Sequence, residues 1–230
     1  MKKIFIIVLF VMSWMFFDTA EGADWAQFGR YENGNKELTE RPEAVMFGNS
    51  ITDFWIERDS AFFAENHLAD RGISGQTTVQ MLARFRQDVL SLNPKAVVIM
   101  AGINDIAENN GPIKLENVLG NIQSMCELAE LHSIKVVLCS VTPCDSFPWN
   151  PDIKPAAKIL RLNAMIKKYA EKKGIPYVDY YSAMVGKRGE MRPELTVDGC
   201  HPNIKGYKVM EPIVLGVIKK ITAPLMPKYR

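Results

Sequence analysis

Short apolar runs alternate with longer amphipathic stretches along most of the chain. The apolar runs predict five strands, at residues 44–48, 68–72, 95–101, 134–141 and 175–180. The amphipathic stretches have helical periodicity and predict helices at residues 53–66, 78–92, 114–132, 155–173 and 204–221. Parallel strands need crossover connections, and the helices supply them. We therefore predict an α/β fold with three α/β/α layers, built on a doubly wound, parallel, five-stranded sheet.

The first residues have the pattern of a secretory signal peptide. Lys2 and Lys3 precede an apolar run from Ile4 to Phe17, and Ala20-Glu21-Gly22 follows, as in a basic start, a short apolar core and small residues near a cleavage site. The run is short for a membrane span, and a retained anchor is the alternative. No cysteine lies near the expected cut, so a lipid anchor is not indicated. We expect removal of residues 1–22 and one secreted or periplasmic domain over residues 23–230, with no stable membrane span.

Between this leader and the first strand, residues 23–41 are polar but carry Trp25, Phe28 and Tyr31 at helical spacing. This spacing predicts an N-terminal helix packed on the domain. No internal repeat, low-complexity tract or linker interrupts the rest of the chain.

Composition argues against several classes of function. A length of 230 residues allows one domain with a sizeable core. The formal net charge of only +2 does not suggest a nucleic-acid surface. The three histidines, His67, His132 and His201, lie far apart in the sequence and lack metal-ligand spacing, so we expect no metal. Neither a G-x-G-x-x-G nor a P-loop pattern occurs, which argues against nucleotide binding.

The four cysteines show no redox or zinc spacing. Cys126 and Cys139 lie within apolar stretches and are expected to be buried as small hydrophobic side chains. Cys144 and Cys200 lie in predicted loops. A disulfide between Cys144 and Cys200 is one alternative in an oxidising compartment, and two free thiols are the other.

Ligands of doubly wound sheets bind at the carboxyl ends of the strands, so the loops that follow the strands are where functional residues are expected. Ser50 stands directly after the first strand, on the turn into a helix, where it could be a nucleophile or only an N-cap. The second loop holds Gly75, whose backbone N–H could face a substrate oxygen, although its glycines could be turn residues. The third loop holds Asn104, which could point an amide donor into the cleft or simply cap a turn. Ser74, between two glycines, is a rival nucleophile without the strand-to-helix placement.

The last loop, before the closing helix, contains Asp198 and His201 three residues apart. If the segment turns, the histidine could accept a serine proton while the aspartate fixes its tautomer. His67 and His132 fall near predicted helix ends, and we expect both at the surface. The four loops together thus predict a nucleophile, two oxyanion donors and an acid–base pair.

The sequence blocks GNSIT, GISGQTT, GINDI and DGCHPN resemble the four blocks of the SGNH (GDSL-like) hydrolase superfamily. Their spacing is most similar to the branch that resembles platelet-activating-factor acetylhydrolase subunits and bacterial GDSL-like esterases. The resemblance extends over residues 44–221 and implies a flavodoxin-like fold. It implies Ser50 as nucleophile, His201 as base and Asp198 as its partner. It further implies an oxyanion hole made by the backbone N–H groups of Ser50 and Gly75 and the Asn104 side chain, and no metal or organic cofactor.

One position departs from the family pattern, because Asn49 stands where the first block usually has aspartate. We expect altered electrostatics at the turn but retained activity. The G-x-S-x-G elbow of α/β-hydrolases is absent, which argues against that fold.

The expected substrate is a short acyl ester, acetyl above all, on a carbohydrate or small molecule. The loop at residues 142–155 carries Phe147 and Trp149 among polar residues; aromatic rings suit a sugar face, but they could equally pack over the core edge. The alternatives are a lysophospholipase or thioesterase acting on longer chains, and an inactive carbohydrate-binding module. The sequence does not indicate an oligomeric state.

Overall fold

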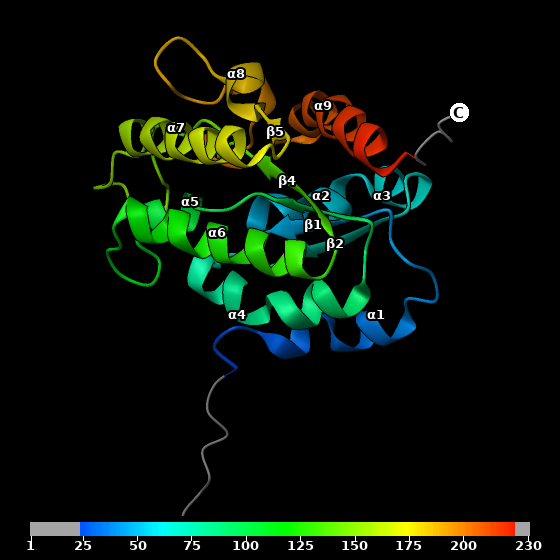
Figure 1. Cartoon of the computed structure of the whole chain (residues 1–230). Helices are drawn as coiled ribbons and strands as arrows, with labels where there is room; N and C mark the ends of the chain where they lie inside the picture. The colour runs from blue at the N-terminus through cyan, green and yellow to red at the C-terminus, as the bar shows by residue number, and fades with distance from the viewer. Residues whose placement is uncertain (1–23, 224–230) are drawn as a thin grey trace, which may run out of the picture.

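A computed structural model describes residues 24–223 and shows a five-stranded, all-parallel sheet. Its strands lie in the order β2-β1-β3-β4-β5 (Figure 1). Their bounds are β1 (Ala44–Gly48), β2 (Leu68–Gly72), β3 (Ala96–Ile99), β4 (Lys135–Cys139) and β5 (Tyr177–Val178). The chain runs from β1 outward to β2 and then returns past β1 to β3, so β1 and β3 form the topological switch point at which such sheets bind ligands. The predicted fold class is confirmed, whereas the predicted signal peptide lies outside the described residues.

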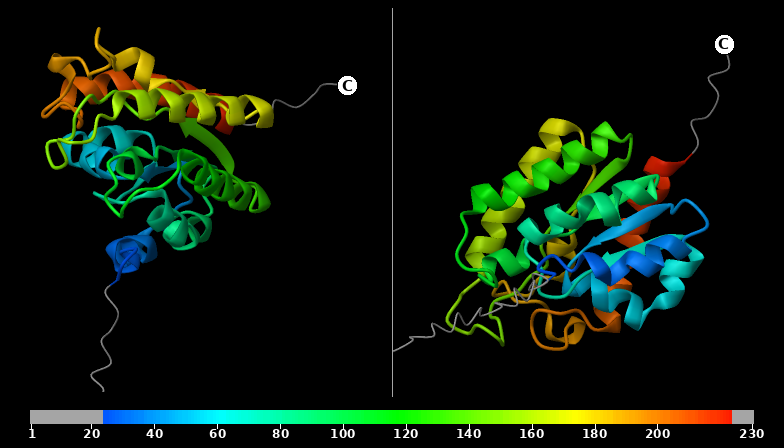
Figure 2. Two further views of the ribbon diagram at one scale, coloured as in Figure 1. Left: turned by 90° about the vertical axis from the view of Figure 1, so that its left-hand side faces the viewer. Right: turned by 90° about the horizontal axis from the view of Figure 1, so that it is seen from below.

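Helices cover both faces of the sheet and make it the middle of three layers (Figure 2). On one face lie α4 (Thr78–Asp88), α6 (Leu115–Leu131) and α7 (Ala156–Lys173). On the other lie α2 (Ser50–Arg58), α3 (Ser60–Glu65), α8 (Tyr180–Met184) and α9 (Ile204–Thr222). The shorter elements are η1 (Phe28–Tyr31), α1 (Glu32–Glu37), η2 (Leu90–Leu92), α5 (Ile103–Ile106) and η3 (Pro193–Leu195).

Each strand contributes to two separate hydrophobic clusters, as the alternation of side chains along a strand requires. Val45 and Phe47 of β1 belong to the cluster beneath α4, α6 and α7. Ala44 and Met46 belong to the cluster beneath α2 and α9. Because both faces are buried, β1 and β3 are apolar throughout, which explains their nearly continuous runs in the sequence. β2 differs, because it carries the buried charged residues Asp70 and Arg71.

The predicted helix at residues 53–66 is wrong in one respect, because it is two helices. The backbone leaves helical geometry at Asp59, with φ −148° and ψ 69°, and the Asp59 carboxylate accepts the N–H of Phe62 at 3.2 Å to cap α3. The fifth strand is also shorter than predicted, because Asp179 caps a new helix, α8, directly after Val178.

The predicted N-terminal helix is only partly present. Within residues 24–37, which we call the N-terminal segment, η1 and α1 cover residues 28–37, and the segment lies beside α4 (Figures 1 and 2). Its attachment is largely polar. Tyr31 donates its hydroxyl to Asp70 at 2.9 Å, and the side-chain amide of Gln76 donates to the carbonyl of Ala26 at 2.8 Å.

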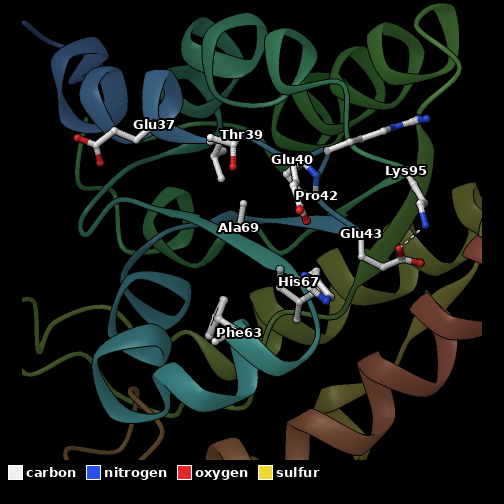
Figure 3. Close-up of a pocket in the computed structure, with 13 residues that line it drawn as sticks. Glu37, Thr39, Glu40, Pro42, Glu43, Phe63, His67, Ala69 and Lys95 are labelled. Carbon is white, nitrogen blue, oxygen red and sulfur yellow. Dashed lines mark hydrogen bonds and ion pairs between the residues drawn. The ribbon is translucent and has the colours of Figure 1, made fainter.

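A cavity of about 490 Å³ lies at the amino ends of the strands, the end opposite to the loops that follow them (Figure 3). His67 lies in it, as does the ion pair between Lys95 and Glu43, whose atoms are 2.6 Å apart (Figure 3). None of the residues predicted for the active site lines this cavity.

Candidate active site

Ser50 stands on the turn from β1 into α2, at the carboxyl end of the sheet. Asn49 is the N-cap residue, and its carbonyl accepts the N–H groups of Thr52 and Asp53 at 3.0 and 2.9 Å. Ser50 is therefore the first helical residue and not the cap. Its hydroxyl lies 2.9 Å from Nε2 of His201, a residue 151 positions further along the chain.

His201 and Asp198 lie in one tightly closed loop. The second ring nitrogen of His201, Nδ1, lies 2.7 Å from Oδ2 of Asp198. The other carboxylate oxygen of Asp198 accepts the backbone N–H groups of Cys200 at 2.9 Å and His201 at 2.7 Å. Burial favours protonation of this carboxyl, but these hydrogen bonds outweigh it and hold the pKa of Asp198 below its usual value. An ionised Asp198 favours the imidazole tautomer with its proton on Nδ1, in which Nε2 can accept a hydrogen bond from the Ser50 hydroxyl.

Gly75 lies on the loop that follows β2, and Asn104 lies in α5, the short helix that follows β3. Gly75 has φ +79° and open space where a β-carbon would stand, so a substrate atom can approach its backbone closely. The Asn104 side chain is buried and donates one N–H to the carbonyl of Gln76 at 3.0 Å. The side-chain amide has two N–H groups. This bond uses one of them and orients the side chain, so the second N–H remains available to a ligand.

The rival residues are engaged elsewhere. Ser74 donates its hydroxyl to Asp53 at 2.6 Å, so its partner is a carboxylate and not a histidine. His132 is exposed at the end of α6, with Nδ1 2.8 Å from the carbonyl of Leu128. His67 is exposed at the opposite end of the sheet. The predicted surface positions of both histidines are confirmed.

Asp53 supports this site and was missed by the sequence analysis. It lies one turn after Ser50 in α2, and its Oδ2 accepts both the N–H of Ser74 at 3.0 Å and the hydroxyl of Ser74. Its Oδ1 lies 3.2 Å from Nη2 of Arg30 in the N-terminal segment. One buried carboxylate therefore joins the helix of Ser50 to the loop of Gly75. A β-carbon at Gly72 would collide with the Asp53 backbone, so the two elements also touch directly.

Aromatic rings form the rim of the site on either side of His201. The ring centre of Phe54 lies 5.4 Å from that of His201, and the ring centre of Trp149 lies 5.7 Å from it. Trp149 is 45% exposed, whereas Phe147 is fully buried beneath it. The sequence left open whether these rings bind a sugar or pack over the core edge. Phe147 packs in the core, whereas Trp149 faces solvent beside His201.

The four cysteines are free thiols, and all four are buried. The sequence allowed a disulfide between Cys144 and Cys200, but the structure does not contain it. The Cys144 thiol donates instead to the carbonyl of Ser146 at 3.0 Å. Across residues 24–223, no three His, Cys, Asp or Glu side chains gather so as to hold a metal ion. No helix in that range is both long and apolar enough to span a bilayer.

Comparison with known proteins identifies the family of the chain. Residues 46–209 match the GDSL-like lipase/acylhydrolase family. The structure of a GDSL-like lipase from Bacteroides thetaiotaomicron VPI-5482 shares 46% identity with the chain, covers 85% of it and 98% of the lipase, and gives a TM-score of 0.82. The structure of a Bacteroides fragilis NCTC 9343 protein assigned as an acylhydrolase shares 47% identity over 87% of the chain and 100% of that protein, with a TM-score of 0.84.

More distant relatives carry more specific descriptions. An isoamyl acetate-hydrolyzing esterase of Saccharomyces cerevisiae is 25% identical over 213 residues, which are 80% of this chain and 89% of the esterase. A lipoprotein of Bacillus subtilis, YqeF, is 34% identical over 118 residues, 44% of this chain, and the match spans only about half of that relative, 49%. An acetyl xylan esterase structure, with 21% identity, a TM-score of 0.63 and coverage of 76% of this chain and 98% of the esterase, shares the fold. Since the family match covers most of the chain, the protein belongs to the GDSL-like lipase/acylhydrolase family and is an esterase or acylhydrolase of that family.

Proposed function

We propose that this protein is an exported serine esterase that removes short acyl groups, acetyl above all, from carbohydrate esters. One observation carries the chemical part of the proposal. The hydroxyl of Ser50 lies 2.9 Å from Nε2 of His201, whose Nδ1 lies 2.7 Å from Asp198. A hydroxyl, an imidazole and a carboxylate in this order are the groups that acyl transfer through serine requires.

The mechanism follows from the positions of the protons. His201 takes the proton of Ser50 as Ser50 Oγ attacks the ester carbonyl, and Asp198 stabilises the imidazolium that forms. The N–H groups of Ser50 and Gly75 and the second N–H of Asn104 stabilise the oxyanion. His201 then gives its proton to the leaving alcohol, and an acyl-Ser50 remains. Water attacks this ester with His201 again as base, which releases the carboxylic acid and restores the Ser50 hydroxyl.

The substrate part of the proposal rests on the rim. The exposed ring of Trp149 and the half-buried ring of Phe54 flank His201, and the amide of Asn109 lies beside Trp149, with Trp149 Nε1 donating to Asn109 Oδ1 at 3.2 Å. Flat apolar faces with polar neighbours suit a sugar ring better than a long acyl chain, which needs an extended apolar groove. The acetate ester named for the yeast relative and the acetylated xylan named for the structural neighbour support a short acyl group.

Export is part of the proposal and rests on the predicted signal peptide, with support from the lipoprotein relative. A mature N-terminus near residue 23, found by sequencing the protein from the extracytoplasmic fraction, is the expected result. An intact Met1 in the cytoplasm would contradict it.

The test of the chemistry compares two serines. Ser50→Ala should lower kcat by on the order of 10⁴–10⁶, whereas Ser74→Ala should have a much smaller effect. The assays are hydrolysis of p-nitrophenyl esters from acetate to palmitate and release of acetic acid from acetylated xylan or pectin. If Ser74→Ala is inactive and Ser50→Ala is active, the assignment of Ser50 as the nucleophile is wrong. A preference for octanoate or longer esters, with no release from any glycan, would favour the long-chain alternative.

A further inference from the structure

Two of the three tryptophans in the described residues are exposed, and both lie at the carboxyl end of the sheet. Trp55 is fully buried, whereas Trp25 is 52% and Trp149 45% exposed. Trp149 lies beside His201, but Trp25 belongs to the N-terminal segment and has no part in the mechanism above. Single exposed apolar side chains are ordinary on a protein surface, so it is the groove beside Trp25 that marks this residue as part of a binding surface.

Trp25 forms one wall of a groove of about 490 Å³. The groove is lined by Trp25, Thr77, Val79, Asn110, Pro112 and Ile113, with Asp105 and Gly111. Among the described residues that line the groove, Asp105 alone is ionisable. Both of its oxygens accept hydrogen bonds from Thr78, so its carboxylate is already engaged. The volume falls within the range of about 300–1,000 Å³ found for small-molecule sites.

The groove is continuous with the active site through two neighbouring asparagines. Asn109 donates its amide to the carbonyl of Gly75 at 3.1 Å and accepts the indole N–H of Trp149. The next residue, Asn110, donates to the hydroxyl of Thr77 at 3.0 Å and so lines the groove. The exposed surface therefore runs from Trp149, past Gly75, to Trp25.

The backbone at Trp25 is held by α4 and by the loop that carries Gly75. Its carbonyl accepts the side-chain amide of Gln80 at 2.8 Å. The carbonyl of the next residue, Ala26, accepts the side-chain amide of the buried Gln76, which directly follows Gly75. Because the backbone is fixed in this way, ligand binding does not need to order the segment that carries the indole ring.

We propose that this groove is a second sugar-binding site. It binds sugar units of a neutral glycan chain other than the unit that carries the acyl group, with one sugar ring stacked on Trp25. The proposal rests on the proposed function and extends it from an acylated sugar to an oligosaccharide. A glycan fits the lining because it is uncharged and offers apolar faces to Trp25 and hydroxyls to Asn110 and Thr77. An acyl tail fits less well, since the surface between Gly75 and the groove carries the polar side chains of Asn109 and Asn110.

The test compares Trp25→Ala with Phe28→Ala. Phe28 is a matched control because it is an exposed aromatic of the same segment, 42% exposed, that lines a different cavity. We expect kcat/KM for p-nitrophenyl acetate to be equal in wild type and both variants. For acetylated xylooligosaccharides, kcat/KM should rise with chain length in the wild type and in Phe28→Ala. Trp25→Ala should lose that rise through KM, by roughly tenfold for the longest substrate, the equivalent of about 1.4 kcal/mol of binding.

Two results would overturn the groove proposal while leaving the esterase intact. The first is an unchanged dependence on glycan length in Trp25→Ala. The second is a loss confined to p-nitrophenyl octanoate and longer esters, which would identify the groove as an acyl site. If the wild type releases no acetate from any glycan, the proposed substrate is wrong. Titration with unacetylated xylohexaose then tests whether the groove binds sugar, independently of the esterase activity. Binding that is lost in Trp25→Ala supports the sugar site, and the absence of binding refutes it.

Discussion

The substitution Asp53→Asn tests whether the oxyanion loop depends on a single carboxylate. Both oxygens of Asp53 face donors: Ser74 on one side and Arg30 on the other. An asparagine of the same size must place its NH₂ against one of them, whichever way it turns. The variant should therefore loosen the loop that carries Gly75 without removing any group that touches the substrate.

The magnitude follows from the bonds that are lost. A hydrogen bond to a buried charged group contributes about 1.5–3 kcal/mol, whereas the pair with Arg30, half of whose side chain is exposed, adds little because exposed ion pairs contribute about 0–1 kcal/mol. The asparagine keeps its oxygen on Ser74 by turning its NH₂ to the exposed Arg30, so the hydrogen bonds of Ser74 weaken to those of a neutral acceptor, about 0.5–1.5 kcal/mol. Transmitted to the transition state, a loss of about 1–1.5 kcal/mol lowers kcat by roughly five- to thirteenfold, at about 1.36 kcal/mol for each factor of ten. KM should change little, because oxyanion donors act mainly on the transition state.

Steady-state kinetics on p-nitrophenyl acetate, together with thermal unfolding, measure both effects. Asp59→Asn is the control, because Asp59 caps α3 and pairs with Lys208 away from the oxyanion loop; it should lower Tm and leave kcat unchanged. If Asp53→Asn lowers Tm as much as the control and keeps kcat within about twofold of wild type, the positioning role is refuted.

Three further predictions concern the remaining groups. Asn104→Ala should lower kcat by roughly 10²–10³ with KM little changed; an effect on KM alone would make Asn104 a residue that only positions substrate. Activity should rise with pH over the range of about 5–8 in which histidines titrate, and His201→Gln should abolish that rise along with most activity; a flat wild-type profile would exclude a histidine base. Burial raises the pKa of the Asp70 carboxyl to about 7, above its value of about 3.9 in an unfolded chain, so its contribution to stability is complete below about pH 4 and is lost as pH rises to about 7. Asp70→Asn should remove this loss, at about 1.4 kcal/mol per pKa unit. Urea unfolding at pH 5 and 8 measures the free energy of unfolding at each pH. An equal change in that free energy between the two pH values in wild type and variant would refute the prediction.

The strands and the four functional loops could be predicted because their signals are local in the sequence. β1 is a buried apolar run, Ser50 follows it directly, and Asp198 and His201 are three residues apart. The break at Asp59 could not be predicted, because the apolar spacing continues through it: Trp55, Phe62 and Phe63 all enter the same hydrophobic cluster.

The supports of the site could not be predicted either, because their partners are distant in the sequence. Arg84 has the sequence pattern of a surface residue on α4, yet it is fully buried and donates to the carbonyls of Gly48 and Arg71, both at 3.0 Å. Asp53 and Arg30 are 23 residues apart and carry no motif. Only the tertiary structure shows which buried charges are paired.

The two ends of the described chain lie at opposite ends of the sheet, and this determines which way a tethered enzyme would face. Trp25 lies with the functional loops, beside the groove. The closing helix α9 finishes at the other end, where the carbonyl of Ile221 accepts the side chain of Lys135, the first residue of β4. A carrier or surface attached before residue 24 would crowd the functional loops and restrict the entry of bulky substrates. Attachment after residue 223 would turn the cleft outward, so a C-terminal fusion is the suitable form for immobilising this enzyme on a support.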